Sequence, residues 1–197
     1  MNAASWMKLL QHKSSVMYSH SVRVALLSMS LAKALNLSNS DTQILTRGCF
    51  LHDVGKIMIP EAILHKDEQL TKQQWGIMRL HPEIGLNILE RNGYCNKKIS
   101  DIVQYHHERI DGKGYPKGLS GDEIPFFSRA CAIIDAFDCM MSDRPYRKRT
   151  TIQQAKEELL KHSGTQFDEK IVYRFLELED RFFDLYEAAE ARGNPVL

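Results

Sequence analysis

The sequence predicts an all-α fold, and three observations support this prediction. Apolar residues recur at steps of three and four, which is the spacing of one face of a helix. Capping residues and glycines bound several of these segments. No stretch shows sustained alternation of apolar and polar residues between turn signals, as a half-buried strand would. A chain of 197 residues is expected to fold as one domain and to bury a sizeable core.

The helices can be placed in chain order. Between Val16 and Leu35, His20 and four apolar residues recur on one face. Ser40-Asp41 suits the N-cap of a helix that runs to about His52. Pro82 fits the first turn of a helix that ends near Asn92-Gly93. Other helices are predicted to begin at Pro60 and Thr71 and to span Lys97–His107, Phe127–Met141, Thr150–His162, Asp168–Leu178 and Arg181–Ala191.

One irregular loop and one C-terminal stripe complete this outline. Residues 111–125 hold four glycines and two prolines and are expected to form a loop. The core is expected over about residues 16–178, with a C-terminal helix over about 179–191. Phe175, Leu178, Phe182 and Leu185 form an apolar stripe that would complete the core or pair with a second copy, and we favour the core.

Composition excludes several classes of function. The net charge of +1 gives no broad basic surface for a nucleic-acid polymer, whereas a small anionic ligand remains compatible. No apolar run approaches the ~20 residues that span a bilayer, and Met1–Leu10 lacks a signal-peptide pattern. The four cysteines show no C-x-x-C pairing, which favours free thiols. A cytoplasmic protein without a membrane partner is therefore expected.

His52-Asp53 and Gly55-Lys56 form the first cluster of candidate metal-site residues. A lone His-Asp pair is more often a satisfied surface pair than a ligand pair. The glycine permits close backbone approach, and a lysine beside a metal site suits a phosphate oxygen. The pair therefore becomes a stronger candidate when all four residues are taken together.

Buried polar residues form the second set of candidates. Asp135 lies in an almost wholly apolar helix, where an unpartnered carboxylate is costly, so it should meet a cation or a metal. His20 lies on an apolar face and, taken alone, suits a hydrogen-bonded core histidine. His81 suits a helix cap, whereas two adjacent residues, His106 and His107, favour ligation.

The combination of these residues points to transition metals. Four or five imidazoles with two carboxylates suit zinc, iron, manganese or nickel rather than magnesium or calcium. So many ligands can hold two ions. Two ions ~3.5–4 Å apart can activate a water and clamp a phosphodiester for in-line attack.

Six motifs resemble the HD-GYP family, and they occur in the family's order over about residues 20–175. These motifs are His20 with Arg23-Val24, His52-Asp53-Val54-Gly55-Lys56, His81-Pro82-Glu83-Ile84-Gly85, His106–Pro116, Asp135 with Asp143–Arg147, and Gly164–Asp168. The run from His106 to Pro116 matches without a gap.

The resemblance implies an all-helical phosphodiesterase that hydrolyses cyclic di-GMP to the linear dinucleotide pGpG or to GMP, by attack of a hydroxide that bridges two metal ions. The implied ions are iron or manganese, with zinc, nickel or cobalt as alternatives. Asp53 and Lys56 are the implied catalytic residues, and Lys56, Tyr115, Arg144 and Asp111 are the candidates for substrate binding, although Asp111 better suits ordering of the loop. The implied metal ligands are His20, His52, Asp53, His81, His106, His107 and Asp135.

Some choices stay open. Val16 stands where some relatives carry a glutamate that helps to hold a third metal, so two ions are favoured over three. The alternatives to a cyclic di-GMP phosphodiesterase are a phosphohydrolase for another nucleotide or cyclic dinucleotide, a non-catalytic cyclic di-GMP sensor, and a structural helical protein. Only about fifteen residues precede the first motif, so the chain is expected to be a stand-alone copy or an excised domain. A homodimer or a regulatory sensory domain or protein is a candidate partner.

Overall fold

The computed structural model describes residues 3–94, 96–143 and 148–178, and the described residues contain helices but no β-strand. The predicted all-α class is therefore confirmed. The α-helices are α1 (Ala3–Lys13), α2 (Ser15–Ala34), α3 (Asn39–Leu51), α4 (Glu61–Leu64), α5 (Lys72–Met78), α6 (His81–Arg91), α7 (Lys97–Tyr105), α8 (Phe126–Met141), α9 (Ile152–Lys161) and α10 (Glu169–Leu176), and two 3-10 helices are η1 (Val54–Met58) and η2 (Gly121–Glu123).

Local capping explains where the helices begin. The Ser14 hydroxyl accepts the Met17 N–H at the start of α2. The hydroxyl of Ser38 caps α3, two residues before the position expected from the sequence. Thr71 forms a reciprocal capping box with Gln74 at the start of α5, which satisfies two backbone donors at once.

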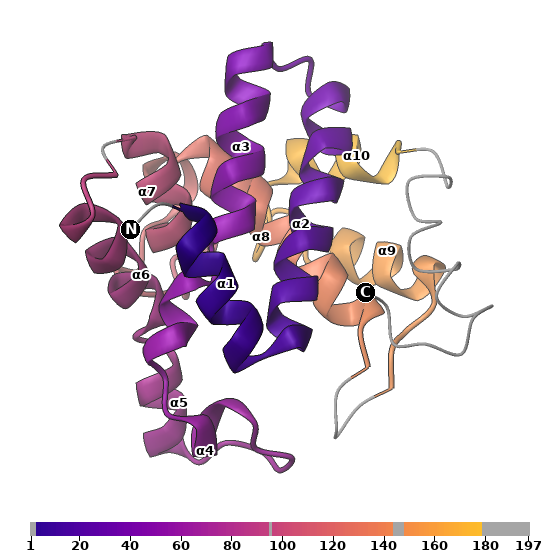
Figure 1. The fold of residues 1–197 in the computed structure, drawn as a ribbon. Helices are drawn as coiled ribbons and strands as arrows, with labels where there is room; N and C mark the ends of the chain where they lie inside the picture. The colour runs from indigo at the N-terminus through magenta and orange to yellow at the C-terminus, as the bar shows by residue number, and fades with distance from the viewer. Residues whose placement is uncertain (1–2, 95, 144–147, 179–197) are drawn as a thin grey trace, which may run out of the picture.

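Two hydrophobic cores hold the helices together. Helices α2 and α3 lie side by side, and α8 passes behind them in Figure 1. The larger core joins α2 and α3 to α8, α9 and α10, and it includes the edge-to-face pair of rings of Phe137 and Phe175. The smaller core includes Leu51, Leu89 and Val103, from α3, α6 and α7. Since α3 and α7 contribute to both cores, they form the wall on which the site is built.

Helix α1 was not predicted from the sequence. Its Met7 and Leu10 are buried in the smaller core. The Lys13 ammonium donates hydrogen bonds to the carbonyl oxygens of Ile57 (2.5 Å) and Ile59 (2.6 Å). Helix α1 thus supports η1, the segment that follows Asp53.

Two glycines let η1 approach α6 closely. A Cβ atom on Gly55 would lie 1.9 Å from the His81 carbonyl oxygen and 2.6 Å from the Gly85 amide nitrogen. Any side chain at Gly55 would therefore separate the two segments. The Gly55 of one motif and the Gly85 of another meet here, and their contact brings Asp53 near His81.

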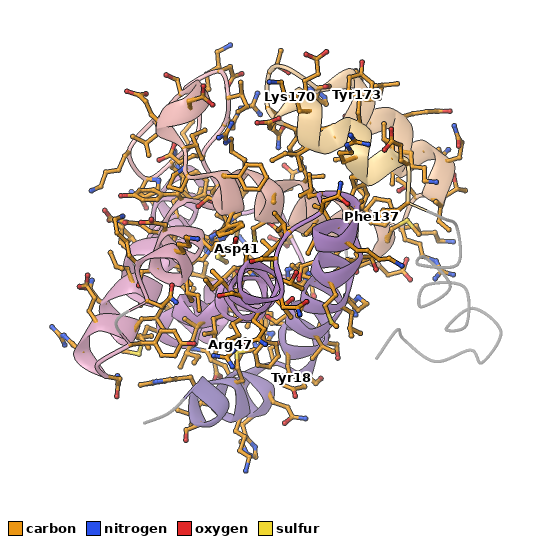
Figure 2. The ribbon with its side chains drawn as sticks, turned by 90° about the horizontal axis from the view of Figure 1, so that it is seen from above. Tyr18, Asp41, Arg47, Phe137, Lys170 and Tyr173 are labelled. Atoms are coloured by element: carbon orange, nitrogen blue, oxygen red, sulfur yellow. The ribbon has the colours of Figure 1, made fainter. Side chains whose placement is uncertain are left out.

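Several expectations fall outside the described residues. They include the helix expected at 181–191 with Phe182 and Leu185, and the candidate phosphate ligand Arg144. Within the described part, Phe175 and Leu178 are buried in the larger core, as the core alternative predicts for this half of the stripe. Seen from above in Figure 2, Lys170 and Tyr173 lie on the outer side of α10, away from that core.

Candidate metal centre and adjoining pocket

The seven predicted metal ligands lie together, although they come from five helices. His20 lies on α2, His81 begins α6 and Asp135 lies on α8. The remaining four follow the C-terminal ends of α3 and α7: His52, Asp53, His106 and His107. Three helix ends and the middle parts of α2 and α8 thus meet at the site.

Three of the imidazoles are oriented by the backbone carbonyl group three residues earlier in the chain. The Nδ1 atoms of His52, His81 and His106 lie 2.6 Å from Cys49 O, 2.8 Å from Met78 O and 3.0 Å from Val103 O, respectively. A carbonyl oxygen only accepts, so each Nδ1 carries the proton and each Nε2 presents a lone pair. The Nε2 atoms of His81 and His106 then face each other at 3.2 Å. Bare nitrogens at this distance suit a shared cation.

Asp53 lies between two groups of histidines. Its Oδ1 atom lies 3.2 Å from His81 Nε2 and 3.9 Å from His106 Nε2. Its Oδ2 atom lies 3.7 Å from His20 Nε2 and 3.5 Å from His52 Nε2. Each carboxylate oxygen therefore faces its own pair of imidazoles, which is the arrangement needed for one carboxylate to bridge two ions.

A buried acceptor without a donor shows that a cation fits here. Asp53 Oδ1 accepts no hydrogen bond within the described part of the chain, and it is shielded from solvent. His81 Nε2, which lies 3.2 Å away, carries no proton in the tautomer fixed by Met78 O. An orphaned carboxylate oxygen is costly unless a cation meets it. The imidazole and carboxylate donor set therefore fits a divalent transition metal.

Three overlapping groups of ligand atoms exist among the described residues, and within each the atoms lie within 4.8 Å of one another. They are Asp53 with His81, His106 and His107; His20 with His52 and Asp53; and His20 with Asp135 and Cys139. Cys139 was not taken as a site residue in the sequence, yet its sulfur lies 3.4 Å from Asp135 Oδ1. Position 139 is one helical turn after Asp135, and this spacing was the available signal.

Asp138 is a second site residue that the sequence reasoning missed. Its carboxylate lies 2.7 Å from His20 Nδ1 and also pairs with Arg23 through Nε (2.7 Å) and Nη2 (2.9 Å). Asp138 and Arg23 are both buried. A carboxylate behind a ligating imidazole fixes its tautomer and raises its basicity. Asp138 therefore orients His20 from outside the group of candidate metal ligands.

The charges of the buried groups suit a cation site. Burial opposes ionisation of Asp53, but Lys56 and His52 hold its pKa well below the usual value. Burial and the neighbouring His107 keep the pKa of His106 well below 6.5, so that ring is neutral. For His20, burial is outweighed by hydrogen bonds to Asp135 and Asp138, which raise its pKa to about 9. A metal would therefore displace a proton from His20.

Lys56 stays charged beside the Asp53 carboxylate. Its Nζ atom lies 2.6 Å from Asp53 Oδ2. Although burial opposes the charge, Asp53 and Asp135 raise the pKa of Lys56 above 10.5. An ammonium at the edge of the cluster can meet a phosphate oxygen.

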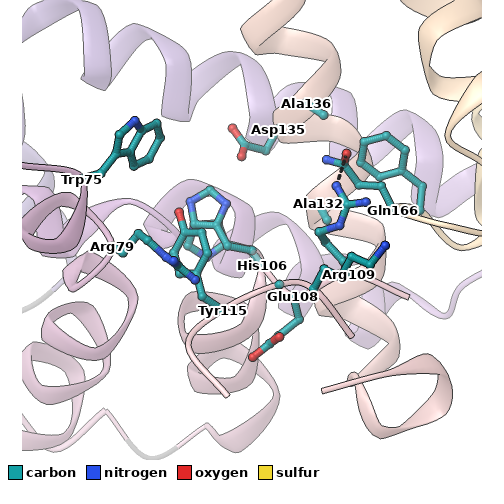
Figure 3. Close-up of a pocket in the computed structure, with 14 residues that line it drawn as sticks. Trp75, Arg79, His106, Glu108, Arg109, Tyr115, Ala132, Asp135, Ala136 and Gln166 are labelled. Carbon is teal, nitrogen blue, oxygen red and sulfur yellow. Dashed lines mark hydrogen bonds between the residues drawn. The ribbon is translucent and has the colours of Figure 1, made fainter. Parts of the chain in front are cut away.

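A pocket of about 390 Å³ opens beside the cluster. His106, His107 and Asp135 form its metal-site wall, and Trp75, Arg79, Arg109, Tyr115 and Gln166 are among the other lining residues (Figure 3). The volume lies in the range of small-molecule sites. Neither Lys56 nor Asp111 lines this pocket.

The glycine loop is held by carboxylates and by a neighbouring segment. The buried Glu108 accepts backbone N–H bonds from Lys117, Gly118 and Leu119. Asp111 pairs with Arg109 at 2.8 Å and accepts the Lys113 N–H, so its contacts order the loop, as the sequence suggested. The Asp111 N–H donates to Thr165 O, which ties the loop to the late Gly-x-Gln-Phe-Asp motif.

This helical fold and its histidine and aspartate cluster define an HD-type domain. The HD domain family model matches residues 5–171, so the chain belongs to the HD domain family. This match confirms the family recognition made from the motifs.

Two curated relatives and one solved structure give the comparison more detail. The chain is 41% identical to 3'3'-cGAMP-specific phosphodiesterase 2 of Vibrio cholerae, over 83% of this chain and 31% of that protein. It is 36% identical to a cyclic di-GMP phosphodiesterase of Thermotoga maritima, over 90% of this chain and 49% of that protein. A solved HDG"Y"P protein from Bdellovibrio bacteriovorus shares the fold, with a TM-score of 0.67 at 23% identity over 85% of this chain and 56% of that one. The chain thus spans about a third to a half of the length of these curated relatives.

None of the described helices is long and apolar enough to cross a bilayer.

Proposed function

We propose that this chain is a metal-dependent phosphodiesterase that hydrolyses a cyclic dinucleotide, with cyclic di-GMP as the expected substrate and pGpG or GMP as products. The observation that carries the proposal is the position of Asp53, whose two carboxylate oxygens face two separate pairs of imidazoles. The adjoining pocket supplies space for a nucleotide beside this cluster.

The proposed cofactor is a pair of divalent transition metal ions, with iron or manganese favoured. His81, His106 and His107 would hold one ion with Asp53, and His20, His52 and Asp135 would hold the other with Asp53. When bound, two such ions supply Lewis acidity that activates a water and neutralises charge on the phosphate. Val16, which is exposed one helical turn before His20, offers no ligand for a third ion.

The chain's own residues would position and stabilise the substrate. The Lys56 ammonium would meet a phosphate oxygen and give a proton to the leaving ribose oxygen. The pKa of Tyr115 is raised by burial and then by Asp135, so its hydroxyl stays neutral and can donate a hydrogen bond to the nucleotide. Arg144 would provide a bidentate fork for a phosphate, by its motif position. Asp111 would act through its loop.

A second candidate substrate is 3'3'-cGAMP. The observation that favours it is the 41% identity to a Vibrio cholerae phosphodiesterase whose name specifies that compound. The two substrates differ in one purine base, so the same phosphodiester chemistry would serve both.

The test compares Asp53→Ala with Asp67→Ala, which removes an exposed carboxylate outside the cluster. Asp53→Ala should lose bound metal and lower kcat for cyclic di-GMP about a thousandfold or more, since metal clamping contributes several kcal/mol to catalysis. Asp67→Ala should keep both. Metal content would be measured by elemental analysis and product by chromatography, with 3'3'-cGAMP assayed in parallel. Full turnover by Asp53→Ala would show that the bridging role is wrong.

A further inference from the structure

Trp75 is a large aromatic side chain that remains half-exposed at the edge of the pocket. Its exposed fraction is 50%, and it lines the pocket together with Arg79, one helical turn later. Helix α5, which carries Trp75, has no buried residues. The indole therefore adds little to the core, and its position at the pocket needs another explanation.

Besides the histidines, Tyr115 and Phe167 also line the pocket; Phe167 is buried in the larger core, and other groups pack on the Tyr115 ring. The Arg79 guanidinium carbon lies 4.4 Å from the centre of the Tyr115 ring. The His107 ring stacks on Tyr115 with a centroid distance of 4.7 Å and an interplanar angle of 27°. Both groups therefore pack on the Tyr115 ring. Tyr115 offers a ligand its hydroxyl rather than an open ring face.

The Trp75 indole, in contrast, has open ring faces. No ring or cation packs on its indole within the described part of the chain. Figure 3 shows Trp75 on one side of the pocket and Arg109 with Gln166 on the other, while Asp135 and His106 lie between them. If the phosphate of a nucleotide lay beside Asp135 and His106, the sugar and base attached to that phosphate could reach Trp75.

We propose that Trp75 is a stacking platform for one purine base of the substrate. This inference rests on the proposed function and deepens it, because a cyclic dinucleotide carries a base next to each phosphate. Every base has a π-face, so stacking on an indole is tolerant of the base and contributes affinity for guanine and adenine alike. Trp75 would therefore strengthen binding without choosing between cyclic di-GMP and 3'3'-cGAMP.

A fluorescence experiment tests the platform without any need for turnover. The chain has two tryptophans, and Trp6→Phe leaves Trp75 as the sole indole. The metal-free Trp6→Phe protein would be titrated with GMP, with cyclic di-GMP and with ribose 5-phosphate, which lacks a base. We expect saturable quenching by the first two ligands and none by ribose 5-phosphate. The Trp75→Phe protein, which keeps Trp6, should show no saturable response.

Steady-state kinetics provide the second readout. Trp75→Ala should raise KM for cyclic di-GMP and for 3'3'-cGAMP roughly 5- to 100-fold, which is the range expected for one stacked base. Its kcat should stay within about twofold, because this contact binds ground state and transition state alike. In Trp75→Phe, KM should return most of the way to the wild-type value, because phenylalanine also offers a ring for stacking. Unchanged metal content in both variants would show that the fold is intact.

The outcomes separate this inference from the proposed function. Quenching by GMP without hydrolysis of either cyclic dinucleotide would support the platform and overturn the proposed substrates. Hydrolysis with a wild-type KM in Trp75→Ala, or the absence of quenching by GMP, would show that Trp75 is not a base platform.

Discussion

Asp138→Asn perturbs the support of His20 while leaving every proposed metal ligand in place. In the native structure Asp138 Oδ2 lies 2.7 Å from His20 Nδ1 and 2.9 Å from Arg23 Nη2, and Oδ1 lies 2.7 Å from Arg23 Nε. An asparagine keeps the shape but has only one accepting oxygen. Its NH2 group must take the place of one carboxylate oxygen, where it faces either Arg23 Nε or both His20 Nδ1 and Arg23 Nη2, all of which donate to that carboxylate in the native structure.

Two losses are expected, and they have different sizes. Breaking a buried ion pair by neutralising one partner costs about 3–5 kcal/mol, so the free energy of unfolding of metal-free protein should fall by about 3 kcal/mol or more. Arg23 would retain the Ser142 hydroxyl at 2.9 Å, which places the loss at the lower end of that range. Losing the carboxylate behind His20 should weaken metal affinity about 10- to 100-fold.

The double variant Arg23→Met with Asp138→Asn separates these two effects. Removing both charges should restore at least half of the lost stability, because no buried guanidinium then lacks its carboxylate. Metal affinity should stay low, because His20 still lacks its partner. Urea unfolding of metal-free protein would report stability, and competition with a chromophoric chelator would report metal affinity. Wild-type metal affinity in Asp138→Asn would refute the role assigned to Asp138.

Two further predictions concern the backbone beneath the site and its pH dependence. Gly55→Ala places a Cβ atom 1.9 Å from the His81 carbonyl oxygen. We therefore expect the free energy of unfolding, measured with urea, to fall by about 1–3 kcal/mol or more and metal binding to weaken. Wild-type stability of this variant would contradict the close approach of the two segments. The pKa of His20 is raised from 6.5 to about 9 in the folded protein, so its contribution to the stability of metal-free protein is fully present below pH 6.5 and is lost as pH rises through about 9. Metal affinity should rise over the same pH interval, because the proton that competes with the metal for His20 leaves. A His20→Gln variant should show neither the loss of stability nor the rise in metal affinity that His20 contributes over this interval.

The sequence predicted most of the described helices and the seven candidate metal ligands, but not the contacts between them. The spacing of His20, Val24, Leu27 and Leu31 encodes one face of a helix, and that face is buried as expected. The spacing within one helix does not specify which helix it will meet. The position of Asp53 between two imidazole pairs depends on the close approach at Gly55, which only the folded chain shows.

The residues missed by the sequence reasoning share a physical cause. Helix α1 buries Met7 and Leu10, but a short segment with a weak pattern gives little signal by itself. Asp138 resembles an ordinary polar residue until Arg23 and His20 converge on it from another helix. Trp75 resembles a core residue in the sequence, and only its exposure at the pocket distinguishes it.

The most direct test of the proposed binuclear centre is the metal content of freshly purified protein, measured by elemental analysis beside product analysis with cyclic di-GMP. Two pairs of imidazoles with Asp53 between them predict about two equivalents of iron or manganese and the appearance of the linear dinucleotide. Removal of the metal by a chelator should abolish the product, and reconstitution should restore it. Protein that binds no metal even after reconstitution would contradict the assignment of the cluster.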